Sequence, residues 1–347
     1  MAMSDRGAVT RQSAQARPCE TAQTQRLESA QARPLEPAEA RPLETTQAHR
    51  PESAQAHPLA FAQARLLEAP RFEVIPVGGI EAKVAVLPRG STVTVTASPR
   101  QGIERTLEVS AALAARGYVV VPHLAARMIT GRGHLQRIVA RLAAASIREA
   151  FVVGGDATPP AGAYRDAGDL LDELASLRHS LTRIGVGGYP EGHPLISDER
   201  LLEALRRKQP GADYIVTQIC FEAQALTRWI DRVREAGIDL PVVVGLPGVV
   251  ERRKLAEISL RTGVGASLRY LARHGGQIAA LARFRRYDPT PLVRALAAGL
   301  DQQALGIEGV HLFTFNQVEA TQAWARRISP LGSASPMSPS PAPIRAG

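Results

Sequence analysis

Eight short apolar runs alternate with stretches of helical character between about residues 69 and 328. Most runs are continuously apolar and rich in β-branched residues, which is typical of parallel strands covered on both faces. Eight such alternations in about 250 residues predict a (β/α)8 TIM barrel, with a doubly wound open sheet as the alternative. The runs are Phe72–Val77, Thr92–Ala97, Tyr118–His123, Ala150–Gly154, Ile184–Tyr189, Tyr214–Phe221, Pro241–Leu246 and Val310–Phe315.

The segments between the runs have the spacing of amphipathic helices, with apolar residues three and four positions apart. The first connection, Gly78–Gly90, is short for a full helix, whereas the seventh, Gly248–Gly309, has room for two or three. The clearest helical segments are Gly102–Ala115, Gly133–Ala145, Asp198–Lys208 and Gln224–Ala236.

The residues before the barrel form an octapeptide repeat from Ser13 to Glu68, with Ser29–Glu36 as its clearest copy. Proline in most copies interrupts any helix, and one Leu per copy offers too little apolar surface to order the chain. We therefore expect residues 1–68 to be disordered, with a flexible docking arm as the functional alternative. The Ser/Pro-rich residues 329–347 are expected to be a second disordered tail.

The composition excludes several classes of protein. Formal net charge is +9, but no Lys/Arg tract is interleaved with aromatic residues, so we expect no nucleic-acid partner. No apolar run approaches the length of about 20 residues that a membrane span needs, and the N-terminus lacks the apolar core of a secretory signal. Two cysteines, Cys19 and Cys220, make no disulfide framework. The sequence predicts a soluble, cytoplasmic protein.

Polar residues stand at or near the ends of seven of the eight runs, where a barrel places its functional site. Singly, each has a structural explanation, such as a capping Asp or a hydrogen-bonded core His. Together they indicate a polar-lined pocket. Glu73 is the exception in position, since it lies inside the first run, and a carboxyl group pointing into the lumen there would suit a general acid. The set is Glu73, Thr96, His123, Asp156, Tyr189, His193, Gln218 and Asn316.

The chemistry is narrowed by the motifs that the sequence lacks. It has no trio of His and acidic residues with metal-ligand spacing, so no metal is predicted. It has no G-x-S-x-G elbow and no P-loop. The glycines of Gly185–Gly188 lack the third Gly and the later acid of a dinucleotide-binding turn. A buried acid among amides, hydroxyls and histidines suits an organic cofactor that carries the reaction itself.

Over about residues 70–328 the chain resembles the flavin-dependent methylenetetrahydrofolate reductase family. Seven pieces match in order, and all fall at predicted strand ends. They are Phe72-Glu73-x-x-Pro76, Val93–Thr96, Val121–Leu124, Gly155-Asp156, Tyr189–Pro194, Gly211–Asp213 through Gln218, and Thr314–Asn316.

The resemblance implies an enzyme that uses FAD to reduce 5,10-methylenetetrahydrofolate to 5-methyltetrahydrofolate. Glu73 resembles the acid that protonates the N10 side of the folate and helps to open its five-membered ring. Asp156 is similar to the carboxylate between flavin and pterin, where it would tune the flavin and hold the pterin ring. Gln218 resembles the amide used in turn by the folate and the nicotinamide donor, NADH or NADPH, in a ping-pong exchange.

The resemblance also implies a set of contacts to the ligands. Lys254 and Asn316, with Glu73 and Gln218, stand at positions that contact substrate in the family. Arg207 and Lys208 match basic positions near the FAD phosphates. The other positions that match flavin contacts are Thr96, His123, Tyr189 and His193.

Four positions depart from the family pattern. Gly154 stands where the family has Arg before Gly-Asp, and Arg127 is the candidate replacement. Leu201 stands where an acid contacts the ribose. Lys254 and Ile258 stand where many members have Gln and an aromatic residue or Leu, so the donor preference is open. We therefore expect a divergent member.

Two other functions remain open at this stage. One is a related flavin or folate enzyme of one-carbon metabolism with another substrate or direction. The other is a barrel that binds folate or flavin without turnover, although the acid at Glu73 argues against it, since a Leu would serve a purely structural role better. The oligomeric state, including a homo-oligomer, is also open.

Overall fold

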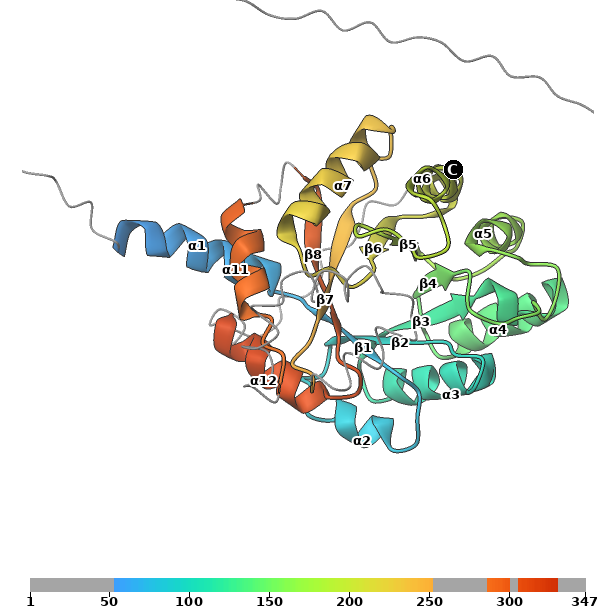
Figure 1. Cartoon of the computed structure of the whole chain (residues 1–347). Coiled ribbons are helices and arrows are strands. Elements are labelled where there is room, and N and C mark those ends of the chain that lie inside the picture. The colour runs from blue at the N-terminus through green and yellow to red at the C-terminus, as the bar shows by residue number, and fades with distance from the viewer. Residues whose placement is uncertain (1–52, 252–285, 300–304, 330–347) are drawn as a thin grey trace, which may run out of the picture. The chain divides into compact units, whose positions relative to one another are not determined.

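Eight parallel strands close into a barrel in the order β1 to β8, as expected (Figure 1). The computed structural model describes residues 53–251, 286–299 and 305–329. Each strand is hydrogen-bonded to its neighbours in sequence, and β8 closes the ring against β1. The strands are β1 (Arg71–Val74), β2 (Thr92–Val95), β3 (Val119–Ala125), β4 (Glu149–Val153), β5 (Arg183–Gly188), β6 (Tyr214–Thr217), β7 (Val242–Pro247) and β8 (Ile307–Phe313).

Helices surround the strands and cover their outer faces (Figure 1). The four helices predicted from apolar spacing are all present, and α2 is a helix of 5 residues, as its short connection requires. The helices in the described ranges are α1 (Ser53–Leu66), α2 (Ile80–Val84), α3 (Gly102–Ala114), α4 (Arg132–Ala144), α5 (Ala167–Ala175), α6 (Asp198–Lys208), α7 (Ala223–Glu235), α11 (Thr290–Gly299) and α12 (Val318–Ile328), with 3-10 turns at Ala126–Met128 and Gln209–Gly211.

Side chains alternate along each strand between the helix-covered face and the barrel lumen. On β1, Phe72 and Val74 belong to the large outer core. On β3 and β4, Val121 and Phe151 belong to a separate cluster that fills the lumen together with residues of β6 and β7. This alternation sends Glu73, between Phe72 and Val74, into the lumen.

A polar layer fills the amino end of the lumen. The Tyr214 ring lies between two guanidinium groups, with the Cζ of Arg71 at 4.5 Å and that of Arg183 at 4.6 Å from the ring centroid. Arg71 also donates hydrogen bonds to the Tyr214 hydroxyl at 3.0 Å and to the Glu149 carboxylate at 2.6 Å. Gly185 makes room for this ring, because a Cβ atom there would lie 2.3 Å from the Cζ of Tyr214.

Replacing Gly185 with Ala is therefore expected to destabilise the barrel by about 1–3 kcal/mol, the usual cost of overfilling a packed interior. The Tyr214 ring is buried and contacts two guanidinium groups, which limit its movement. Urea denaturation measures the loss. Gly309→Ala is the matched control on β8, since a Cβ there meets nothing within 4 Å. Equal stability of the two variants would contradict the role given to Gly185.

The helix α1 corrects the expectation that residues up to Glu68 are disordered, which is wrong for residues 53–66. In the last octapeptide, Phe61–Glu68, Leu66 replaces the proline of the clearest copies. This exchange adds an apolar side chain, and both Leu66 and Leu67 are buried in the main core. The proline of the preceding copy, Pro58, lies within α1, so the buried leucines rather than the loss of proline account for the helix. The rest of the repeat, residues 1–52, and the C-terminal residues 330–347 lie outside the described residues.

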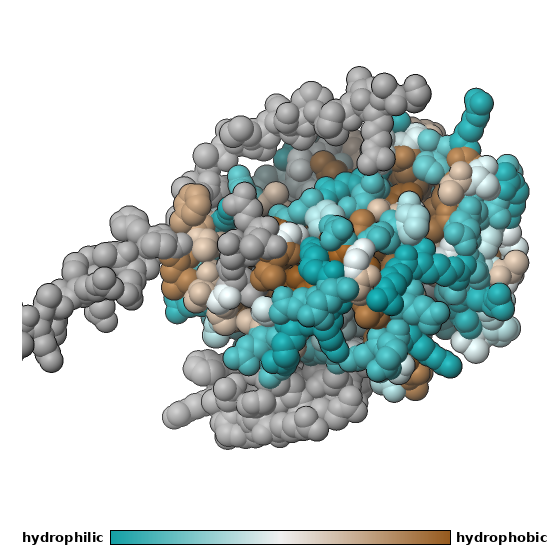
Figure 2. Space-filling model, turned by 90° about the horizontal axis from the view of Figure 1, so that it is seen from above, coloured by the Kyte–Doolittle hydropathy of each residue, from teal (hydrophilic) through white to brown (hydrophobic). Residues whose placement is uncertain are grey.

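Hydrophilic side chains cover much of the face seen in Figure 2, with smaller hydrophobic patches between them. The large apolar side chains exposed in the described ranges include Leu195 and Ile196, in the loop before α6. None of the helices described here combines the length and the hydropathy that crossing a bilayer requires.

Candidate active site

Glu73 occupies the middle of the lumen. Its Oε2 atom lies 3.0 Å from the Nε2 of His311 on β8, at hydrogen-bond distance, and its side chain is 12% exposed. A carboxyl group and an imidazole nitrogen at this distance share one proton, whichever of them carries it. Glu73 therefore has a proton partner inside the barrel and faces the lumen, as the sequence predicts.

His311 is a site residue that the sequence analysis missed. Its side chain is 1% exposed, and its ring packs on Phe313 with the ring centroids 4.7 Å apart. The signal was present, because His311 lies between Val310 and Leu312 in a predicted strand, as Glu73 lies between Phe72 and Val74. The same alternation argument would have placed it in the lumen.

His123 lies on the other side of Glu73, on β3, two residues before this strand ends at Ala125. Its Nε2 atom is 3.6 Å from Oε2 of Glu73, which is too long for a hydrogen bond. Burial lowers the pKa of His123 to about 4, the charge of Glu73 opposes this shift, and His311 adds to it. The imidazole of His123 is therefore neutral at neutral pH.

The lumen stays open on the side of β5. A Cβ atom on Gly187 would have no neighbour closer than the Tyr189 hydroxyl at 3.9 Å and the Phe151 ring at 4.0 Å. By the strand register, the row of His123 runs through Phe151 to Gly185, and Gly187 lies two residues farther toward the carboxyl end of β5. A residue with a side chain at this position would fill space that the glycine leaves free.

Tyr189 and His193 stand together in the loop that follows β5. Their rings meet edge to face, with centroids 5.4 Å apart. Burial raises the pKa of Tyr189, and the negative charge of Asp156 raises it further. Asp156 itself is exposed, in the loop after β4. The structure therefore brings these three predicted residues to one side of the opening.

The loop that carries Asp156 is braced by Arg127. The Nε of Arg127 donates to the carbonyl of Ala157 at 2.7 Å, and its backbone N–H donates to the carbonyl of Gly154 at 3.0 Å. Arg127, the candidate replacement for the missing Arg at Gly154, therefore reaches this loop and contacts its backbone.

Thr96 and Gln218 complete the opening at the ends of β2 and β6. The backbone N–H of Thr96 donates to the carbonyl of Val74 at 3.0 Å. The Oε1 of Gln218 accepts the N–H of Ile219 at 2.9 Å, while its amide NH2 has no partner among the described residues. Gln218 is thus oriented through its oxygen and keeps two N–H donors for a ligand.

The two basic residues of α6 have protein partners. Arg207 pairs with Asp166, Asp169 and Asp172 of the α5 region, at 3.2, 2.8 and 2.9 Å. The Nζ of Lys208 donates to the carbonyl of Gly187 at 2.8 Å, and burial lowers the pKa of Lys208 to about 8. Lys208 therefore reaches the base of the opening, and Arg207 points to the neighbouring helix.

Asn316 joins the ends of β1 and β8. Its Oδ1 accepts the N–H of Ile75 at 2.8 Å, and its Nδ2 donates to the carbonyl of the same residue at 3.0 Å. Asn316 also has a positive φ of 65°, which Asn tolerates better than most residues. The structure thus gives its amide a role in closing the barrel. Lys254 and Ile258 lie outside the described residues.

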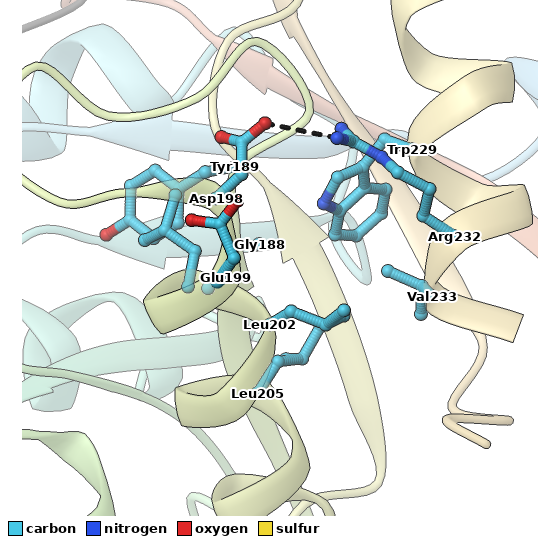
Figure 3. A pocket seen from close by; sticks show the side chains of 11 residues that line it. Gly188, Tyr189, Asp198, Glu199, Leu202, Leu205, Trp229, Arg232 and Val233 are labelled. Carbon is cyan, nitrogen blue, oxygen red and sulfur yellow. Dashed lines mark hydrogen bonds and ion pairs between the residues drawn. The ribbon is translucent and has the colours of Figure 1, made fainter. Parts of the chain in front are cut away.

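A second cavity, of about 210 Å³, lies on the outer side of β5 between α6 and α7. Figure 3 shows the ion pair of Asp198 and Arg232, 3.1 Å long, at one end and Leu202 and Leu205 at the other. Leu201, the departure from the expected acid, lines this cavity as well. Gly187 and Tyr189 line it too.

The chain is a closed (β/α)8 barrel with a buried acid in its lumen and polar residues around the opening at the carboxyl ends of the strands. It therefore falls in the class of (β/α)8-barrel proteins, whose functional site lies at that end. A profile of the methylenetetrahydrofolate reductase family matches residues 79–329. The chain belongs to the methylenetetrahydrofolate reductase family. The matched range begins after β1, so the position of Glu73 rests on the barrel geometry.

Among curated proteins, methylenetetrahydrofolate reductase 2 of Saccharomyces cerevisiae is 36% identical over 93 residues, or 26% of this chain and 16% of that protein. The 5,10-methylenetetrahydrofolate reductase of Escherichia coli is 26% identical over 183 residues, or 51% of this chain and 59% of that protein. A solved structure of oxaloacetate acetylhydrolase has a TM-score of 0.42 at 11% identity, over 77% of this chain and 84% of that one. The matches thus span less than two thirds of these curated relatives.

Proposed function

We propose that this protein reduces 5,10-methylenetetrahydrofolate to 5-methyltetrahydrofolate, with FAD as cofactor and NADH or NADPH as electron donor. The observation that carries the proposal is the Glu73 carboxyl group, buried in the lumen at 3.0 Å from His311. Membership of the methylenetetrahydrofolate reductase family supports the choice of substrate. With two cysteines in the chain, a reducing compartment such as the cytoplasm suits this activity.

Opening the five-membered ring of the folate requires a proton at N10, and Glu73 is the acid that we assign to this step. The O–H bond of the Glu73 carboxyl breaks as the new N–H bond of the folate forms. For this step the acidic proton of Glu73 is on Oε1, while the Nε2–H of His311 donates to Oε2 and keeps this hydrogen bond to the carboxylate that remains. His123, neutral because burial lowers its pKa, adds no competing positive charge beside the acid.

The residues around the opening fit a flavin. We place the flat ring of the flavin beside Gly187, where an added Cβ would meet nothing closer than 3.9 Å, and the contacts would come from Thr96, His123 and Tyr189, with His193 at the rim. When bound, FAD supplies the hydride that completes the reduction. Lys208, already at the carbonyl of Gly187, is nearer to this space than Arg207, which would have to leave its carboxylate partners to reach a phosphate.

Two further residues would serve the exchange of ligands. The free amide NH2 of Gln218 can donate to the folate and, after product release, to the nicotinamide. The exposed carboxylate of Asp156 can accept hydrogen bonds from the pterin ring. Gln218 and Asp156 both lie at the opening of the lumen rather than at the level of Glu73. This position suits residues that bind the part of a ligand that remains near the opening.

The test is an absorbance spectrum of the purified protein before and after NADH. We expect a flavin spectrum that NADH bleaches and that 5,10-methylenetetrahydrofolate restores under anaerobic conditions. Bleaching without restoration by the folate would favour a related flavin enzyme with another substrate. A colourless protein that takes up no added FAD would contradict the proposal.

A further inference from the structure

The Nδ1 of His311 on β8 is buried without a hydrogen-bond partner in the described part of the chain, and so are two polar atoms near Glu73 on the strands that follow β1. They are the Oγ1 of Thr94 on β2 and the Nε2 of His123 on β3. Leaving such an atom unsatisfied costs about 1–3 kcal/mol, so buried polar atoms nearly always have a partner in the protein or in bound water. Each of the two therefore calls for an explanation.

The strand register brings these atoms toward one point. Thr94 is the register partner of Glu73 across β1 and β2. Its neighbours Val93 and Val95 belong to the outer core, so Thr94 faces the lumen like Glu73. His123 faces the same part of the lumen from the next strand, with its Nε2 3.6 Å from Oε2 of Glu73.

The distances leave a position for one water molecule. Two polar atoms 3.6 Å apart are too far for a direct bond, but a water beside them can lie at about 2.8 Å from each. A bound water needs two to four polar partners, and Thr94 supplies the third. We infer that a water molecule is bound in the barrel lumen by Thr94 Oγ1, His123 Nε2 and Glu73 Oε2, and that Thr94 is a positioning residue for Glu73.

The consequence for catalysis rests on the proposed function. Glu73 would be held from β8 by His311 and from β2 and β3 by this water. When Glu73 gives its proton to the folate, the O–H of the water donates to the new carboxylate from the side that His311 does not reach. A carboxylate with two donors is less costly to form in a buried site than one with a single donor.

The first experiment is a crystal structure at a resolution that shows ordered waters. We expect a water within hydrogen-bond distance of Thr94, His123 and Glu73 in the wild type and in Thr94→Ser. We expect it to be lost in Thr94→Val, which keeps the side-chain shape and removes the hydroxyl. A wild-type structure in which no water bonds Thr94 and His123 would overturn the inference.

The second experiment is stopped-flow oxidation of the reduced flavin by 5,10-methylenetetrahydrofolate. Thr94→Val should slow this step about tenfold, a smaller loss than that of the acid itself. Thr94→Ser should restore it to within about twofold, and Thr92→Val, on the same strand toward the amino end, should leave it unchanged. Reduction of the flavin by NADH should be the same in all four proteins.

The two experiments separate failure of this inference from failure of the proposed function. If the wild type does not oxidise its flavin with the folate, the proposed function fails, and the crystal structures still decide whether the water site exists. If the wild type is active and Thr94→Val is equally fast, the positioning role of Thr94 is refuted.

Discussion

Replacing Glu73 with Gln is expected to lower folate turnover by about two orders of magnitude or more, the usual contribution of a general acid. The amide has nearly the shape of the carboxyl and can still bond to His311, but it has no acidic proton to give. Binding of FAD and its reduction by NADH should be unchanged, since neither needs a proton from this side chain. Stopped-flow measurement of the two half-reactions checks both statements.

Glu104→Gln is a suitable control for Glu73→Gln, because Glu104 lies on α3 in an exposed ion pair with Arg141. It should leave both half-reactions unchanged. A Glu73→Gln variant that keeps most of its folate activity would show that the proton comes from another group. A variant that loses flavin binding as well would show that Glu73 contributes to the shape of the flavin site rather than to proton transfer.

Replacing Arg71 with Met is expected to destabilise the protein by about 3–5 kcal/mol, the cost of removing one partner of a buried ion pair. The side chains of Arg71 and Glu149 are 10% and 13% exposed, so the carboxylate of Glu149 would be left charged and poorly solvated. The Tyr214 hydroxyl would lose its donor in the same step. Urea denaturation, with the midpoint and slope both fitted, gives the change in free energy of unfolding.

A second substitution distinguishes the lost charge pair from lost packing. The double variant Arg71→Met, Glu149→Leu should recover much of the stability, because it removes both charges from the lumen. Arg232→Met is the control on the surface, where the half-exposed pair with Asp198 contributes about 0–1 kcal/mol. Similar losses in the free energy of unfolding for Arg71→Met and Arg232→Met would mean that the ion pair of Arg71 and Glu149 does not stabilise the amino end of the lumen.

The barrel could be predicted because its strands are apolar on both faces, a pattern that few other folds share. The strand ends were less accurate, and local hydrogen bonds explain the differences. The predicted sixth run continues to Phe221, but β6 ends at Thr217, since the side chain of Gln218 bonds the next N–H. The predicted eighth run ends at Phe315, whose φ of 48° takes it out of the strand after Phe313.

Of the four polar residues that lie together in the lumen, two could be predicted and two were missed. Glu73 and His123 were found as polar residues of apolar strands, whereas Thr94 and His311 satisfy the same condition and were passed over. Both residues lie one or two positions before the strand ends, where the side chains line the lumen rather than the opening. The partners of Arg207 and Asn316 were beyond prediction, because they come from elements far away in the sequence.

The helix α1 was missed for a different reason. The repeat was interpreted as a unit, and one substitution in its last copy changes the physical outcome. Leu66 adds buried apolar surface at the position where the clearest copies carry proline. Periodic sequences are therefore best interpreted copy by copy at their boundaries with folded segments.

The ring of Tyr214 and the two arginines that contact it occupy the amino end of the lumen, so a ligand would approach Glu73 from the carboxyl end. Under the proposed function, the hydride donor and the one-carbon acceptor would then occupy the same passage in succession. It follows that a compound lodged in this passage would be a competitive inhibitor against both molecules, although they share little chemistry.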